Sequence, residues 1–135
     1  MTRLTEKELF KMSTRNRAAW VKPECAGPIY MPVRAVSTLN AREHWAVRSR
    51  RASEQRETAY TSTPRVSIPQ GGLTVLLTRI GPRELDGDNL QGSLKSVRDG
   101  IAEKLGINDN DPRVRWEYAQ RRGKAREYAV LLEMK

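Results

Sequence analysis

Five apolar residues between positions 90 and 105 follow a helical period, and this pattern constrains the fold more than any other feature of the chain. Successive members are separated by 4, 3, 4 and 4 residues, which places them on one face of a helix. Gly106 follows as a typical C-terminal stop. We therefore expect one amphipathic helix from Asp88 or Asn89 to residue 105. Its apolar residues are Leu90, Leu94, Val97, Ile101 and Leu105.

Segments on both sides of this helix have strand character. The run LTVLLTRI at 73–80 is β-rich and continuously apolar, as in a buried strand. Residues 114–120 and 126–134 alternate apolar and polar side chains around RRGK, so we expect them to form a hairpin. A further short strand is expected at 29–36, where Pro32 favours an edge or a bend.

Two more helices are expected near the N-terminus. Residues 4–20 carry apolar side chains at helical spacing, and residues 37–60 form a basic helix with Ser37, Thr38 or Asn40 as its N-cap. The order helix, strand, helix, strand, helix, strand, strand predicts an α+β domain with a small mixed β-sheet covered by helices.

The length of 135 residues suits a single domain, which we place at 29–135, with an N-terminal helical extension at 1–28. No apolar stretch approaches the length of a membrane span, and the N-terminus lacks the apolar core of a signal peptide. We therefore expect a cytoplasmic protein without membrane contact.

The chain has one cysteine and one histidine, which exclude a disulfide, a Cys/His zinc site and a Cys–His or Ser–His–Asp nucleophile. The histidine, His44, is interpreted as a packing or capping residue.

The formal net charge of +9 indicates a polyanionic partner, with nucleic acid first. The acids are not spread evenly, because all five aspartates lie between positions 86 and 111. A protein that only holds DNA gains nothing from them, since carboxylates repel phosphates and weaken binding. A nuclease needs carboxylates, because they hold the magnesium ion beside the scissile phosphate.

The positions of these acids suggest one site. Asp86 and Asp88 lie at the turn from strand to helix, and Asp109 and Asp111 lie in the turn after the helix. If the loop after the helix folds back to the same edge of the sheet, Asp86, Asp88 and Asp111 form an all-oxygen site suited to Mg²⁺ or Mn²⁺. Lys95 would then place a positive charge near the scissile phosphate. The expected chemistry is hydrolysis of a phosphodiester by a metal-activated water.

A purely structural interpretation of the same residues also stays open. Asp88 would cap the helix with Gln91 as its reciprocal partner, and Lys95 and Asp99 would form an exposed i,i+4 pair. The two later aspartates would then be turn formers.

The sequence pattern also resembles a known family. DGDNL at 86–90, followed by Lys95, by DGI at 99–101 and by the DND turn at 109–111, resembles the RusA family of Holliday junction resolvases and the RusA-like endodeoxyribonucleases of phages and prophages. The resemblance covers roughly residues 29–135. It implies a RusA-like fold and a homodimeric nuclease that depends on magnesium, with manganese as the alternative metal. The implied activity is symmetric cutting of four-way DNA junctions in recombination and repair, with branched DNA as partner and no small-molecule cofactor.

The same resemblance assigns roles to individual residues. Asp86, Asp88 and Asp111 would be the metal carboxylates, with Asp109 as a further metal ligand, and Lys95 would be the catalytic lysine.

Several arginines are candidates for contacts with DNA. The basic segment 37–60 is explained equally well as a solvated helix face. A non-enzymatic basic DNA-binding protein, with the aspartates as caps and turns, is therefore the alternative function. The DNA-contact candidates are Arg42, Arg48, Arg50, Arg51, Arg83 and Arg98.

Overall fold

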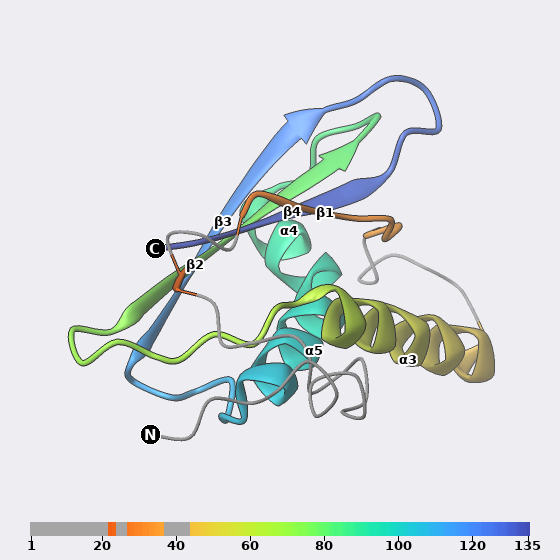
Figure 1. Cartoon of the computed structure of the whole chain (residues 1–135). Coiled ribbons are helices and arrows are strands. Elements are labelled where there is room, and N and C mark those ends of the chain that lie inside the picture. Colours follow the sequence, from red (N-terminus) through yellow and green to blue (C-terminus); the bar gives the residue numbers. More distant parts are fainter. Residues whose placement is uncertain (1–21, 24–26, 37–43) are drawn as a thin grey trace, which may run out of the picture.

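The computed structural model describes residues 22–23, 27–36 and 44–135, and this part is a four-stranded mixed sheet with three helices (Figure 1). The α+β prediction is confirmed at this level. The predicted helix at 4–20 and the candidate N-caps at 37–40 lie outside the described residues. The elements are β1 (Ile29–Met31), α3 (Trp45–Ser62), β2 (Leu73–Gly81), α4 (Gly87–Ser93), α5 (Lys95–Leu105), β3 (Val114–Arg122) and β4 (Ala129–Met134).

The strand order in the sheet is β1-β4-β2-β3. β2 pairs in parallel with β3 and antiparallel with β4, and β4 pairs antiparallel with β1. Leu77 marks the middle of this arrangement, because it is in register with Tyr118 of β3 on one side and Leu132 of β4 on the other. β1 ends directly before Pro32, which cannot donate a ladder hydrogen bond.

The predicted hairpin between residues 114–120 and 126–134 is wrong, because β2 lies between β3 and β4. The physical reason is the crossover through α4 and α5, which returns the chain to the sheet parallel to β2. The segment after β3 then passes over the end of β2, where the amide of Gly123 donates to the carbonyl of Gly81 at 2.8 Å. An apolar central strand thereby gains a partner on each edge.

The predicted continuous helix is in fact two helices that meet at Leu94. Leu94 has φ −102° and ψ 2°, and its amide donates to Gln91 O at 3.2 Å in a tighter turn. The hydroxyl of Ser93 also donates to Leu90 O at 2.7 Å, a local bond that competes with regular helix geometry. The predicted apolar face is nevertheless confirmed, because four of its five members are buried and Leu105 packs partly buried against them. Gly106 ends α5 in the left-handed conformation with φ 70°, as expected.

The core lies between one face of the sheet and the helices. Val75 and Leu77 of β2 belong to the same buried cluster as Val97 and Ile101 of α5. α3 packs on α5 in turn (Figure 1). His44 is the N-cap of α3, since the amide of Ala46 donates to its Nδ1 at 3.2 Å, which confirms the capping interpretation.

Within the described residues, no helix has the length and apolar character needed to cross a membrane.

Candidate functional site

Asp86 and Asp88 lie where the chain passes from β2 into α4. Asp86 is the N-cap, and its Oδ1 accepts the backbone amide of Asn89 at 3.1 Å and the side-chain amide of Asn89 at 2.6 Å. Asp88 is exposed in the first turn of α4. Both carboxylates therefore lie at the end of the helix that favours negative charge. The structural interpretation in which Asp88 is the cap is wrong.

Gln120 of β3 fixes the loop that precedes Asp86. The amide of Leu85 donates to Gln120 Oε1 at 2.9 Å, and Gln120 Nε2 donates to Leu85 O at 2.6 Å. The two bonds set the place of Asp86 along the sheet. The alternating pattern of β3 gave no signal for this contact, because it assigns Gln120 to a face of the sheet without naming a partner 35 residues away.

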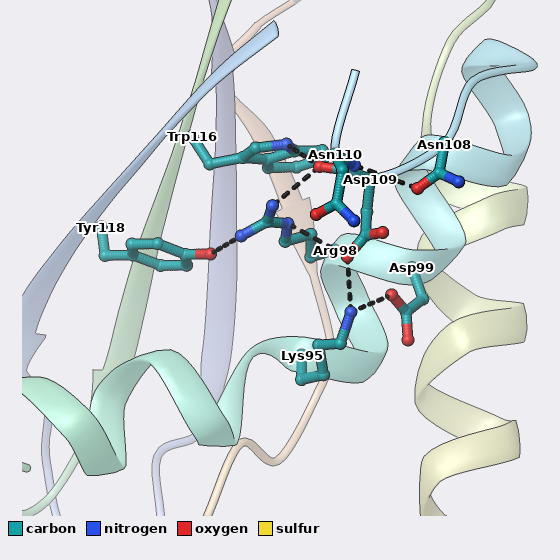
Figure 2. A network of polar contacts seen from close by, with 8 residues as sticks. All are labelled: Lys95, Arg98, Asp99, Asn108, Asp109, Asn110, Trp116 and Tyr118. Atoms are coloured by element: carbon teal, nitrogen blue, oxygen red, sulfur yellow. Dashed lines mark hydrogen bonds and ion pairs between the residues drawn. The ribbon is translucent and has the colours of Figure 1, made fainter. Parts of the chain in front are cut away.

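Lys95, the first residue of α5, contacts carboxylates from two parts of the chain (Figure 2). Its ammonium donates to Asp99 Oδ1 at 2.8 Å and to Asp109 Oδ2 at 2.5 Å. The pair with Asp99 is the predicted i,i+4 pair. The contact with Asp109 shows that the turn after α5 folds back along the helix. The aspartate that it brings to Lys95 is Asp109.

These charges shift one another's titration. The hydrogen bond from Lys95 lowers the pKa of Asp109, and the bonds to Asp109 and then Asp99 raise the pKa of Lys95. The side chain of Lys95 is 56% exposed, against 21% for Asp109. Lys95 is therefore cationic at neutral pH and accessible from solvent, as a group that contacts a phosphate must be.

Arg98 holds the turn that carries Asp109 and does not face outward. Its guanidinium donates to Tyr118 Oη at 2.9 Å and to the backbone oxygen of Asp109 at 2.7 Å. Its Nε lies 3.7 Å from Asp109 Oδ2. The guanidinium also stacks 4.8 Å from the centre of the Trp116 ring, and the indole N–H donates to Asp109 O at 3.1 Å. Figure 2 shows this arrangement between α5 and β3.

Asp111 lies two residues farther along the turn and has a different partner. Its carboxylate accepts the Arg113 amide at 2.9 Å and the Arg113 guanidinium at 3.0 and 2.7 Å. The bonds from Arg113 lower the pKa of Asp111 to about 2. The chain thus places the two aspartates of this turn in separate ion pairs.

The described residues do not form the expected metal site. Among them, no three acidic or other ligating side chains are arranged so that they could hold a metal ion. Asp86 caps α4, Asp109 is bound by Lys95, and Asp111 is bound by Arg113. The donor set in this arrangement does not fit magnesium, which requires several oxygen ligands around one point. We therefore assign no chemical step to a metal.

The arginines predicted to contact DNA lie in three places. Arg48, Arg50 and Arg51 are on α3, and Arg83 lies in the loop after β2. Arg98 is committed to the internal contacts described above. Arg42 lies outside the described residues.

Comparison of the sequence with protein-family models gives no match, and comparison with curated proteins gives none either.

Proposed function

We propose that the protein is a RusA-like, structure-selective endodeoxyribonuclease that cuts four-way DNA junctions in recombination and repair in the cytoplasm. The observation that carries the proposal is the direct contact between Lys95 and Asp109, which are 14 residues apart in the chain. Two residues that the sequence resemblance assigned to one site are partners in one ion pair. A four-way junction has two-fold symmetry, so a homodimer would present one such site to each of two opposing strands.

Charge and accessibility support a phosphate as the target of Lys95. The chain carries a net charge of +9, which attracts DNA. Lys95 holds Asp99 and Asp109 by exposed ion pairs, and such pairs exchange partners at low cost. Its ammonium can therefore donate to a phosphate oxygen and stabilise the negative charge that develops during cleavage.

Magnesium, with manganese as the alternative, enters this proposal only from the sequence resemblance. Its requirement is tested by chelation.

The experiment uses an end-labelled synthetic four-way junction and a linear duplex of the same sequence. We expect paired symmetric cuts in the junction alone, in the presence of magnesium and not of chelator. Asp88→Asn should bind the junction without cutting it, because the sequence resemblance makes Asp88 a metal carboxylate. Glu103→Gln is the matched control, because Glu103 is an exposed acid of α5 outside the polar network, and it should cut like the wild type. Cleavage retained in Asp88→Asn would contradict the role that the resemblance assigns to Asp88.

The second candidate function is a DNA-binding protein without enzymatic activity. The specific observation in its favour is that Asp86 and Asp111 already have structural roles as a helix cap and as an ion-pair partner. Binding of the junction that is equal with and without chelator, with no cleavage in magnesium or manganese, would replace the nuclease proposal by this one.

A further inference from the structure

A cavity of about 800 Å³ opens at the C-terminal end of β2, outside the polar network of Lys95. Its wall contains side chains from three separate parts of the chain. They come from the segment after β1, from the end of β2 with its following loop, and from the loop before β4. The residues that matter here are Arg34, Arg79, Arg83, Leu85, Arg126 and Tyr128.

The cavity is strongly cationic. Four of its lining residues are arginines, and none is an aspartate or glutamate. None of the ion pairs formed within the described part of the chain includes Arg34, Arg83 or Arg126. Uncompensated guanidinium groups around a hollow favour an anion, and their planar donors match phosphate oxygens.

Buried Arg79 builds the frame of this cavity. It is 3% exposed, and its Nε donates to Ala35 O at 2.8 Å while its Nη1 donates to Arg83 O at 2.7 Å. One guanidinium thereby joins the segment after β1 to the loop after β2. Arg79 is a positioning residue that holds these two walls in place.

The remaining arginines are presented from the edges of the cavity. Arg34 lies over the ring of Tyr128, 4.9 Å from its centre. Arg126 is exposed and is the one non-glycine residue with positive φ in the described part of the chain, at 63°. This left-handed backbone conformation is uncommon for a residue other than glycine.

We propose that this cavity binds backbone phosphates of one DNA strand beside the candidate site, with Arg34, Arg83 and Arg126 as the contacting groups. The inference rests on the proposed function and specifies how the same site holds its substrate. DNA is favoured over a small anion because the cavity is far larger than one phosphate group and the whole chain attracts a polyanion. Leu85 in its wall is also followed directly by Asp86, so the cavity adjoins the start of α4.

The test measures binding of a fluorescently labelled four-way junction in chelator, in which the proposed nuclease does not cut. Arg126→Gln and Arg83→Gln should each weaken binding about tenfold and reduce the slope of log K against log salt by about 1. The matched control is Arg115→Gln, which removes the same charge from an exposed residue of β3 outside this cavity, and it should have little effect. Equal losses of junction affinity in all three variants would overturn the proposal.

A second variant separates binding from folding. Arg126→Gly suits the left-handed backbone at 126, so it should keep or raise the melting temperature while binding DNA as weakly as Arg126→Gln. Wild-type affinity in a folded Arg126→Gly would refute the proposal.

Competition identifies the source of the phosphate. Inorganic phosphate and a single nucleoside monophosphate should compete only at millimolar concentration if the occupant is a DNA strand. Tight binding of either one, with DNA affinity unchanged in Arg126→Gln, would instead assign the cavity to a small anion and overturn the proposal.

Because binding is measured separately from cleavage, a protein that binds DNA through the cavity without cutting it would refute only the nuclease proposal. A protein that cuts junctions, but whose three variants all lose DNA affinity equally, would refute only the cavity proposal.

Discussion

At the scale of single residues, the ion pair of Asp111 with Arg113 gives a direct test of the turn after α5. We expect the Asp111 carboxyl to titrate at about 2, because Arg113 donates to it from both its backbone and its side chain. The folded-state pKa lies below the ordinary value of 3.8, so this pair contributes stability above pH 3.8 that is lost as the pH falls toward 2. Carbon-detected NMR titration of the carboxyl group measures the pKa of Asp111.

Arg113→Gln should raise the pKa of Asp111 toward 3.8, since it removes the first cause of the shift. Arg115→Gln removes a guanidinium two residues away and should leave the titration of Asp111 unchanged. An ordinary pKa for Asp111 in the wild type would show that the pair does not persist in solution.

Replacing Lys95 should change both the pKa of Asp109 and the rate of junction cleavage. Lys95→Gln should raise the pKa of Asp109, because the hydrogen bond from Lys95 is the main cause that lowers it. Its effect on stability should be small, at most about 1 kcal/mol, because the ammonium is 56% exposed. Cleavage of the junction should fall by about 10²-fold to 10³-fold, the range for loss of one donor that stabilises developing charge.

The comparison for Lys95→Gln is Lys104→Gln on the same helix, where Lys104 lies 4.6 Å from the centre of the Tyr60 ring. It changes the same charge away from the two carboxylates and should retain cleavage. A Lys95→Gln protein that is folded and fully active would remove Lys95 from the proposed mechanism.

At the scale of elements, the contact between α3 and α5 depends on the absence of a side chain at Gly100. A Cβ at this position would meet Arg56 O of α3 and would lie 2.9 Å from Ala59 Cβ. We expect Gly100→Ala to lower the free energy of unfolding by about 1–3 kcal/mol, as overpacking does. Denaturant titration measures the loss.

Gly92 in α4 provides the matched control for this substitution. A Cβ at Gly92 would have no atom within 4 Å. Gly92→Ala should therefore leave stability unchanged or raise it by up to about 1 kcal/mol, because alanine is the better helix former. Equal destabilisation by both substitutions would contradict the close approach of the two helices.

The elements differ in how far the sequence predicted them. The apolar face of residues 90–105 was predicted because helix periodicity is a local property. The break at Leu94 was not predicted, because the same apolar face continues through both helices and the bond from Ser93 to Leu90 O leaves no trace in the periodicity. The hairpin was predicted wrongly because alternation identifies strands without identifying which strand lies beside which.

The same limit applies to the candidate site. Sequence spacing indicated the pair of Lys95 with Asp99 and placed Asp109 near the helix. It could not distinguish Asp109 from Asp111 as the partner of Lys95, because that choice depends on how tightly the turn folds back. Arg98 looked like a surface cation, and only the tertiary structure shows that it supports the turn from within.

At the scale of the whole molecule, the strand order predicts which backbone amides exchange slowly with solvent. β2 is paired along both edges, whereas β3 pairs with β2 alone within the described part of the chain. Val75 and Leu77 of β2 are also fully buried. Amides in the middle of β2 should therefore exchange with solvent only through global unfolding, and those on the outer edge of β3 should exchange much faster.

Nuclear Overhauser contacts between backbone protons test the same topology directly. The register predicts contacts of Leu77 in β2 with Tyr118 in β3 on one side and with Leu132 in β4 on the other. A hairpin would instead give contacts between β3 and β4, with β2 outside the pair. The outcome matters for function, because the parallel pairing of β2 with β3 brings Gln120 of β3 to Leu85 at the exit of β2. Contacts between β3 and β4 would contradict the observed strand order, and a lack of contacts between β2 and β3 would contradict the placement of Asp86.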